Sequence, residues 1–437
     1  MRKILIRAGM SPMVNHSPAE VLGCNLIGNN LGNMLFPYSV SRCLMTKDVE
    51  IHALTVQEKY SEAALRKIDE NYDCLILPFA NAFRVSFVEE LKTVTRLVQG
   101  LHIPCIVVGI GAQAGLDKQP ENEELAQAAR EFVGAVLEKS AKIGLRGEFT
   151  ARYLEGLGFR AESDFTVIGC PSMYLYGGRL PEMQVKPLTK DSPVSINSKI
   201  QLPQKFHDFM YRSREALPNY HYIPQVVQEI GMMYQGQEMP GDFVKRLPDH
   251  FPVRWDDEIY AQGKSYFFTN VPAWLQYLEG KEFSFGSRIH GNIAAILAGT
   301  PCFIVVSDQR IRELAEYHQI PHILMKELKK DASIFRFHEQ ADFGGIARGH
   351  QERFQHYLDF LHENGLETVF DGEISPEVTP FDREIQAAGF DMDGGLPLAC
   401  LDEKLRRERL REMGKGKVFW RKARKYLRRK RAGLDTE

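Results

Sequence analysis

The chain lacks the features that define several common protein classes. Its seven cysteines in 437 residues include no C-x-x-C pair, so we expect buried reduced thiols and neither a disulfide nor a zinc framework. No apolar run approaches the length of a membrane span, and the short apolar start at residues 1–10 is typical of a first strand, not of a signal peptide. No H-E-x-x-H, P-loop or G-x-S-x-G motif occurs, which leaves zinc hydrolysis, Walker-type ATP use and serine hydrolysis without support. These absences favour a cytoplasmic globular protein.

Basic residues are concentrated near the end of the sequence. The net charge is −2, but residues 404–431 hold 15 Lys and Arg residues against two acidic ones, so the rest of the chain is acidic. An acidic body argues against nucleic acid as a partner. Within the basic segment, Phe419, Trp420 and Tyr426 share one helical face and basic residues fill the remainder. This pattern predicts a helix bound peripherally to an anionic membrane, such as the inner face of the plasma membrane; the alternative is a solvated tail.

Apolar and amphipathic runs alternate along the first half of the chain. We expect strands at Lys3–Arg7, Asp73–Leu77, Pro104–Val108, Lys142–Leu145 and Phe165–Ile168. We expect helices at Ser61–Glu70, Val88–Gln99, Glu123–Ser140 and Phe149–Leu157. Strands that alternate with helices predict a parallel sheet covered by helices on both faces.

A second series of strands follows a boundary rich in glycine and proline near residues 169–193. The expected strands are Val194–Asn197, Tyr220–Pro224, Tyr266–Thr269, Glu282–Phe285, Cys302–Val306 and Ile320–Leu324. Gln351–Asn364 should be a helix, whereas residues 371–397 are too rich in Gly, Pro and Asp to predict an element.

The fold class that follows is α/β, with two Rossmann-like, doubly wound parallel-sheet domains facing each other across a cleft. We place the first domain at residues 1–185 and the second at residues 190–330. A helical and irregular extension at 331–402 and the basic tail at 403–437 follow them. Two doubly wound halves of this size are common in enzymes that transfer groups to sugars.

The richest candidate site lies in the second domain, where the run SFGSRIHGN passes from a strand into a small apolar helix. Ligands in such folds bind at the carboxyl ends of strands, where helix N-termini favour anions. Arg288 stands at one such end and Arg310 at the next, and a guanidinium grips a carboxylate or phosphate with two hydrogen bonds. His290 can exchange a proton near neutral pH. The binding residues we predict beside them are Ser287, Gly291, Asn292 and Asp308.

Weaker candidates share the carboxyl edge of the first sheet. Asn30 and Asn33 belong to a GNNLGN loop, Asn81 follows the strand at Asp73–Leu77, and Arg146 follows the strand at Lys142–Leu145. Each could be an ordinary capping residue, and their common edge is what makes them candidates for ligand binding. Asp391-Met392-Asp393 mimics a paired-Asp metal motif but follows no strand, so we predict no metal site.

The run GSRIHGNIAAILAGTPCFIVVSDQRIRELAEYHQIPHI resembles the signature of the polysaccharide pyruvyl transferase family. GNNLGN, VGIGAQ, GLRGEFTARYLEGLGF and VIGCPSMYL are similar to earlier pieces of that family, and the resemblance covers about residues 3–325. Two departures concern the first domain. Asn33 stands where the family has an acidic residue and so cannot be a general base, and LPFANAF replaces a glycine-rich turn.

The resemblance implies a GT-B-like pair of domains and a specific chemistry. Phosphoenolpyruvate, the donor substrate, would give its pyruvyl group to two hydroxyls of a saccharide and release phosphate, with no further cofactor. Arg288 would bind the donor, His290 would handle the proton, and Arg310 would be a second anion contact. The second domain would serve the donor and the first the acceptor, whether free or attached to a lipid carrier. Residues 404–431 would bring the protein to the membrane where the acceptor is built.

Two other functions remain open at this point. A nucleotide-sugar-dependent GT-B glycosyltransferase would need a carboxylate near the second-domain loop, and Glu313 and Asp308 are the acids available there. A non-catalytic sugar-binding or scaffold protein of a polysaccharide assembly complex would keep the motif as structure only. The presence of Arg288, His290 and Arg310 together favours an enzyme.

Overall fold

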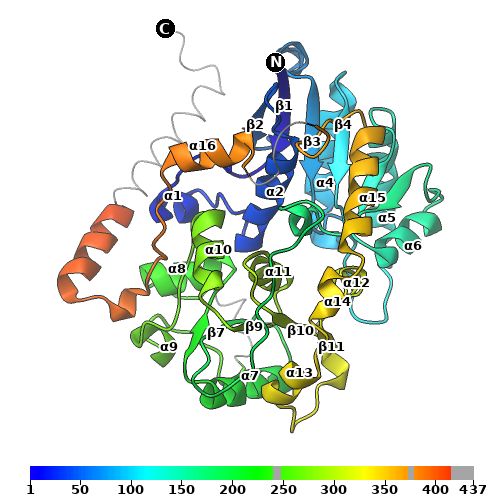
Figure 1. Ribbon diagram of the computed structural model, residues 1–437. Coiled ribbons are helices and arrows are strands. Elements are labelled where there is room, and N and C mark those ends of the chain that lie inside the picture. Colours follow the sequence, from blue (N-terminus) through cyan, green and yellow to red (C-terminus); the bar gives the residue numbers. More distant parts are fainter. Residues whose placement is uncertain (240–247, 373–377, 415–437) are drawn as a thin grey trace.

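The computed structural model describes residues 1–239, 248–372 and 378–414. Its strands form two main parallel sheets, one in the upper and one in the lower half of Figure 1. The first has the strand order β2-β1-β3-β4 and the second the order β11-β10-β9-β7-β8. A short parallel pair, β5 and β6, lies beside β4. The predicted α/β class with two doubly wound sheets is therefore confirmed.

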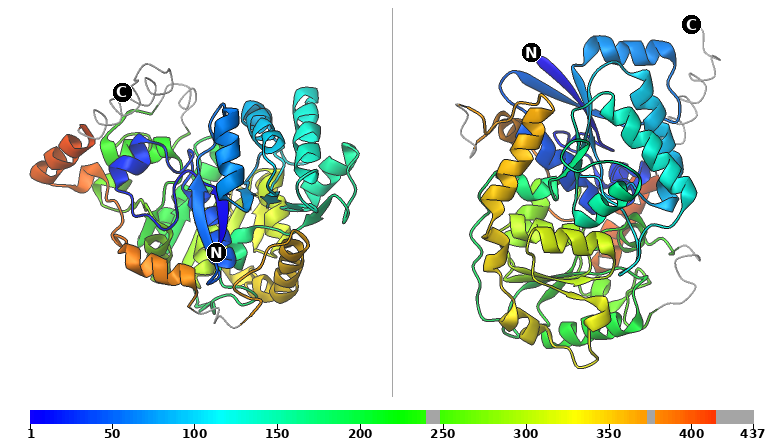
Figure 2. Two further views of the ribbon diagram at one scale, coloured as in Figure 1. Left: turned by 90° about the horizontal axis from the view of Figure 1, so that it is seen from above. Right: turned by 90° about the vertical axis from the view of Figure 1, so that its right-hand side faces the viewer.

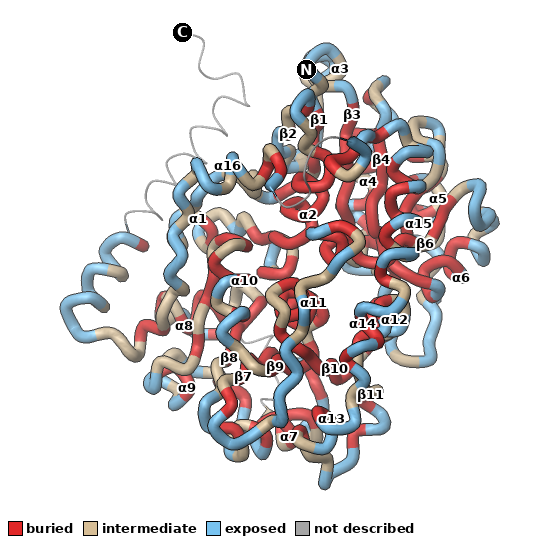
Figure 3. The backbone as a smooth tube through the Cα atoms, in the orientation of Figure 1, coloured by how far each residue is buried: buried red, intermediate tan, exposed pale blue. Residues whose placement is uncertain are grey.

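The strands of the first half are β1 (Arg2–Arg7), β2 (Val49–Leu54), β3 (Cys74–Pro78), β4 (Cys105–Val108), β5 (Ile143–Leu145) and β6 (Phe165–Val167). Those of the second half are β7 (Val194–Asn197), β8 (Tyr220–Tyr222), β9 (Phe283–Gly286), β10 (Cys302–Val306) and β11 (His322–Leu324). Every residue of β3, β4, β7, β9 and β10 is buried, as Figure 3 shows for the centres of both sheets. Strands covered on both faces need continuous apolar runs, which is why the sequence showed them clearly.

The helices of the first half are α1 (Pro18–Gly23), α2 (Leu35–Leu44), α3 (Glu62–Asn71), α4 (Val88–Gly100), α5 (Glu123–Leu137) and α6 (Glu148–Gly156), with the 3-10 turns η1 (Leu31–Met34), η2 (Val85–Phe87) and η3 (Pro171–Tyr174). Alternate residues of β1 point into different cores. Ile4 and Ile6 pack with the α2 side, whereas Leu5 packs with α4 and α5 on the other face. The α2-side core continues without a break into the second domain, so apolar packing joins the two halves.

The second half contains α7 (Gln204–Ala216), α8 (Val227–Gln235), α9 (Glu258–Ala261), α10 (Val271–Glu279), α11 (Ile289–Leu297), α12 (Gln309–Tyr317), α13 (Ile334–Gln340), α14 (Gly344–Ala347), α15 (His350–Glu363) and α16 (Pro380–Ala388), with the turns η5 (Met325–Glu327) and η6 (Leu398–Cys400). The predicted helix at Gln351–Asn364 is α15.

The chain after β11 returns to the first domain (Figures 1 and 2). Asn364, just after α15, donates to the Lys142 carbonyl at 3.2 Å and accepts from the Ala141 N–H at 3.0 Å. Asp382 of α16 forms an ion pair with Arg42 of α2 at 2.9 Å. Because His338 of α13 also meets the edge of the Phe283 ring in β9, the extension at residues 331–402 lies against both halves.

Three details differ from the sequence predictions. The predicted strand at Tyr266–Thr269 is absent, and only isolated bridges from Ser265 to Tyr222 and from Phe267 to Gly395 occur there. The edge strand β2 was missed because the polar sequence VEIHAL exposes part of its length. The stretch for which no element was predicted contains α16, which begins with a capping box at Thr379 and a proline at its first turn.

The predicted membrane helix falls largely on residues 415–437, outside the described residues. Residues 403–414 are helical, and most of their side chains are exposed. None of the helices in the described parts of the chain is long and apolar enough to span a membrane.

Candidate functional site

The topology marks one ligand-binding position in each sheet. A doubly wound sheet opens a crevice where the strand order reverses, at the carboxyl ends of two neighbouring strands. In the first sheet this switch point lies between β1 and β3, and in the second between β7 and β9. Arg7 ends β1, while Asn197 ends β7 and Arg288 follows β9. The two carboxyl edges are therefore where a site should form.

Loops from these two edges meet and hydrogen-bond. The Leu31 N–H donates to the Gln225 carbonyl at 2.7 Å, and the Val227 N–H donates to the Asn29 carbonyl at 3.2 Å. The Gln309 N–H donates to the Ala114 carbonyl at 3.2 Å. We call this junction of the two carboxyl edges the seam.

The Arg288 side chain is already engaged on the second-domain side of the seam. Its Nε donates to the Ser198 carbonyl at 2.8 Å, and its guanidinium lies 3.6 Å from the fully buried Glu229 carboxylate. The backbone N–H of Arg288 donates to Asn197 Oδ1 at 2.7 Å. Burial raises the pKa of Glu229. Arg288 thus holds the loop before α11 in place, in addition to whatever it contributes to a ligand.

Neighbouring predicted residues are also built into this loop. Asn292 donates to the Arg288 carbonyl at 2.9 Å and accepts from Ser284 Oγ at 3.1 Å. A Cβ on Gly291 would lie 2.1 Å from Gln225 Nε2, so a larger residue there would require the Gln225 side chain to move. The Ser287 hydroxyl is buried and has no hydrogen-bond partner among the described residues.

His290 is held at the seam by groups from the first domain. Its ring meets the edge of Phe36 with centroids 5.4 Å apart, and its Nε2 lies 3.9 Å from Cys170 Sγ. A Cβ on Gly32 would lie 2.5 Å from His290 Cβ, so the absence of a side chain at Gly32 makes room for the histidine. Burial, and then Arg146 and Arg310, lower the pKa of His290 well below 6.5. The imidazole is therefore neutral near neutral pH.

Arg146 is a buried cation of the seam whose hydrogen-bond donors are mostly unpaired among the described residues. It is fully buried, its Nε donates to the Gly109 carbonyl at 3.0 Å, and its guanidinium lies 4.6 Å from the centre of the Phe36 ring. Both terminal nitrogens are buried without a hydrogen-bond partner among the described residues. Burial lowers the pKa of Arg146 to about 10. A buried cation with two unpaired donors is costly unless an anion completes the site.

Asp308 and Arg310 supply the second-domain side of this cluster. Asp308 caps α12 by accepting from the Ile311 N–H at 3.0 Å, and its other oxygen lies 3.3 Å from Lys199 Nζ and 3.4 Å from Arg310. Burial alone would raise the pKa of Asp308, but Arg310 and Lys199 outweigh it and hold that pKa below its usual value. The Nε of Arg310 is buried and has no hydrogen-bond partner in the part of the chain that the structure describes.

Glu313 is a seam residue whose place the sequence did not reveal. Its carboxylate accepts from both the N–H and the hydroxyl of Thr150 at 3.0 Å, so a residue of α12 caps α6 of the other domain. Burial raises the pKa of Glu313 to about 7, against the opposing effects of Thr150, Arg146 and Arg310. Glu313 is buried, and both of its oxygens lie within hydrogen-bond distance of Thr150.

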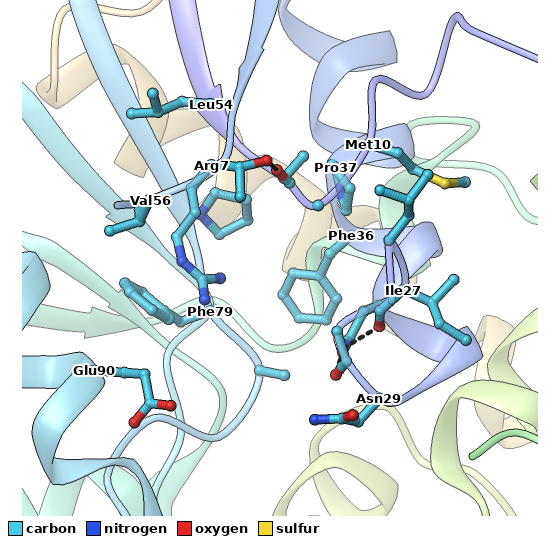
Figure 4. A pocket seen from close by; sticks show the side chains of 18 of the residues that line it. Arg7, Met10, Ile27, Asn29, Phe36, Pro37, Leu54, Val56, Phe79 and Glu90 are labelled. Atoms are coloured by element: carbon cyan, nitrogen blue, oxygen red, sulfur yellow. Dashed lines mark hydrogen bonds between the residues drawn. The ribbon is translucent and has the colours of Figure 1, made fainter. Parts of the chain in front are cut away.

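A cavity of about 900 Å³ opens at the other switch point, beside the seam (Figure 4). Asn33 and Asn81 line it, and Phe36 forms part of its wall while also contacting His290. Asn33 donates to the Ile27 and Gly28 carbonyls, and Asn81 donates to Gln113 at 2.6 Å. Asn30 does not line the cavity, because its side chain caps η1.

The structure therefore divides the predicted residues into groups. The seam cluster contains His290, Arg288, Arg146, Asp308 and Arg310; the cavity contains Asn33 and Asn81; Asn30, Gly291 and Asn292 shape the loops. Among the described residues, no group of three or more His, Cys, Asp or Glu side chains is arranged to hold a metal ion.

The fold and seam define a two-domain α/β protein with a cationic site at facing sheet edges. The polysaccharide pyruvyl transferase family model matches residues 92–309, which include Arg146, Arg288 and His290, and the chain belongs to that family. No curated protein matches the chain.

Similar solved structures include a functionally uncharacterised protein from Klebsiella pneumoniae. The two chains are 13% identical, the match covers 74% of this chain and 92% of that chain, and the TM-score is 0.39. HepE from Anabaena, solved with UDP and glucose, shows 12% identity, 84% and 98% coverage and a TM-score of 0.43. A UDP-N-acetylglucosamine 2-epimerase from Listeria monocytogenes, so described provisionally, shows 10% identity, 84% and 97% coverage and a TM-score of 0.42. We draw no functional conclusion from likenesses this distant.

Proposed function

We propose that this protein transfers the pyruvyl group of phosphoenolpyruvate to two hydroxyls of a saccharide, forming a cyclic ketal and releasing phosphate. The observation that carries the proposal is Arg146, a fully buried guanidinium whose two terminal nitrogens lack partners at the seam, beside Arg310 with its own unpaired Nε. Membership of the pyruvyl transferase family supports the same reading.

The donor suits this site by size and charge. Phosphoenolpyruvate carries a carboxylate and a phosphate on three carbons, and both groups accept paired hydrogen bonds from guanidinium. We assign Arg146 and Arg310 as the main anion contacts and Arg288 as the residue that shapes the loop and adds positive charge. Because Arg146 comes from the first domain and Arg310 from the second, the donor would bind both halves at once.

His290 is the proton carrier in this proposal. Burial, together with the charges of Arg146 and Arg310, keeps His290 neutral, whereas a bound anion would offset those charges and raise the pKa of His290. One sugar hydroxyl proton passes through His290 to the methylene carbon of the donor, which becomes a methyl group, and that hydroxyl oxygen bonds to the neighbouring carbon. The second hydroxyl oxygen then bonds to the same carbon, the carbon–phosphate oxygen bond breaks, and phosphate leaves with the second proton.

The other parts of the proposal concern partners. The acceptor is a saccharide, free or lipid-linked, that enters from the first-domain side, and the reaction needs no cofactor beyond the donor. The basic residues within 404–431 would bind an anionic membrane surface, which would keep the protein where such acceptors are assembled.

Activity with the full-length protein tests the proposal. Phosphoenolpyruvate is incubated with a panel of oligosaccharides, and phosphate release and the pyruvylated sugar are measured by colorimetry and mass spectrometry. We expect His290→Ala to abolish both signals while circular dichroism stays unchanged. His102→Ala is the matched control, since its side chain is 88% exposed and contacts the Asp69 carboxylate. Near-normal turnover by His290→Ala, or glycosyl transfer from a UDP-sugar with none from phosphoenolpyruvate, contradicts the proposal.

A further inference from the structure

The cavity of about 900 Å³ is distinct from the seam cluster and lies at the switch point of the first sheet. Arg7 at the end of β1, Leu54 at the end of β2 and Phe79 after β3 all line it. Phe36 separates it from His290 and Arg146, because that ring lines the cavity and contacts both residues. A ligand here would therefore lie next to the proposed reaction centre without occupying it.

Arg7 points into this cavity without a fixed partner. Its guanidinium stacks over the Phe79 ring at 4.5 Å, and Figure 4 shows it between Phe79 and Phe36. It forms no hydrogen bond or ion pair with a described residue, although Glu90 lies near enough to act on it electrostatically. The pKa of Arg7 is lowered to about 10, mainly by burial and to a smaller extent by Arg84, while Glu90 opposes the shift.

Arg84 is a second guanidinium on the cavity wall. It donates to the Asn81 carbonyl at 3.0 Å and to Ser86 Oγ at 3.2 Å, and it stacks on Phe87 at 5.0 Å, so no carboxylate among the described residues pairs with it. Burial and Arg310 both lower the pKa of Arg84. Positive charges thus follow one another from Arg7 through Arg84 to Arg310 at the seam, with the Glu90 carboxylate acting on both Arg7 and Arg84 and a further anion able to relieve the remaining repulsion.

The remaining walls suit a sugar. The cavity is far larger than a three-carbon donor requires and falls within the range of sites that enclose larger small molecules. Aromatic rings from Phe36, Phe79 and Phe390 offer apolar faces, and the amide oxygens of Asn33 and Asn81 can accept from hydroxyls. The carboxylates of Glu58, Glu89 and Glu90 also line the cavity and can accept from sugar hydroxyls.

We propose that this cavity binds the acceptor as a sugar phosphate, with Arg7 and Arg84 holding the phosphoryl group and the sugar ring lying toward Phe36 and the seam. That the ligand of this cavity is the acceptor rests on the proposed function. The proposal adds the substrate class: a phosphorylated saccharide in place of a neutral one.

Isothermal titration calorimetry on the full-length protein tests it. The probes are hexose 1-phosphates of gluco, galacto and manno configuration, the three free hexoses, inorganic phosphate and phosphoenolpyruvate. We expect at least one hexose 1-phosphate to bind more tightly than its free hexose and than inorganic phosphate. Arg7→Gln and Arg84→Gln should each weaken that binding by about 10-fold or more, because each loses a charge-assisted contact.

Arg66→Gln is the matched control, since Arg66 lies on α3 outside the cavity with 71% of its side chain exposed. It should leave all affinities unchanged. The inference is overturned if no hexose 1-phosphate binds in the millimolar range, if free hexoses bind as well, or if Arg7→Gln weakens phosphoenolpyruvate as much as the sugar phosphate. Tight sugar phosphate binding without any phosphoenolpyruvate binding would instead refute the proposed donor and leave the phosphate-binding cavity standing.

Discussion

Gly32 of the first domain packs directly against His290, the proposed proton carrier, so Gly32→Ala should disturb the seam at that residue. The added Cβ would lie 2.5 Å from His290 Cβ and 2.8 Å from both Cγ and Nδ1 of the ring. Real Cβ contacts do not occur at such distances, and ordinary contact begins at 3.4 Å. One of the two residues must therefore move by about 1 Å.

The magnitude follows from what surrounds His290. Phe36 and Cys170 pack against the ring, so the histidine has little room to move away. Overpacking a dense interior costs about 1–3 kcal/mol of unfolding free energy. A displacement of about 1 Å in a reacting group costs on the order of 100-fold in rate. Gly32→Ala should thus lower stability modestly and pyruvyl transfer strongly.

Urea unfolding and initial-rate measurements separate the two effects. Gly134→Ala in α5 is the control, because an added Cβ there meets no atom within 4 Å. That variant should gain about 0.5–1 kcal/mol, as alanine replaces glycine in a helix, with unchanged turnover. If Gly32→Ala is as stable and as active as Gly134→Ala, the close contact between Gly32 and His290 does not exist as described.

Three further predictions concern charge. Arg146→Met should abolish the rise in thermal unfolding midpoint that phosphoenolpyruvate causes. The ligand-free variant should be at least as stable as wild type, because a buried cation with unpaired donors is removed. A phosphoenolpyruvate-induced rise in midpoint as large as that of wild type would contradict this. Glu313 has its pKa raised from 4.5 to about 7, so the folded state retains its proton longer than the unfolded state, and the stability from this group is present below about pH 4.5 and lost as pH rises through 7. Between pH 5 and 8, the unfolding free energy of Glu313→Gln measured in urea should therefore rise relative to that of wild type by roughly 3 kcal/mol. Unfolding free energies that change with pH in the same way for both proteins would contradict this. Deleting residues 404–437 should reduce co-sedimentation with anionic vesicles but not with neutral ones, and equal binding by the shortened protein would rule out the membrane role.

The sequence identified the fold because the central strands are buried on both faces and read as apolar runs. β7 and β10 begin and end at the predicted residues, and most other predicted elements differ from the structure by a few residues. The failures occurred where tertiary contacts decide. β2 is a half-exposed edge strand, and the residues around Phe267 look like a strand but pair only through isolated bridges.

The candidate site could be predicted only in part. The loop carrying Arg288 and His290 has a local motif, but the groups that surround it come from distant parts of the chain. Glu313 meets Thr150 across 163 residues, and no local pattern connects them. Likewise, nothing in the sequence around Glu229 shows that this acid pairs with Arg288, because that contact exists only after both domains have folded.

A crystal structure of the full-length protein with phosphoenolpyruvate tests the central claim most directly. We predict that one anionic group of the donor accepts hydrogen bonds from both terminal nitrogens of Arg146, with Arg310 on the opposite side and His290 beside the methylene carbon. Density for the donor elsewhere, with the Arg146 nitrogens still unpaired at a donor concentration that saturates binding, would contradict the account.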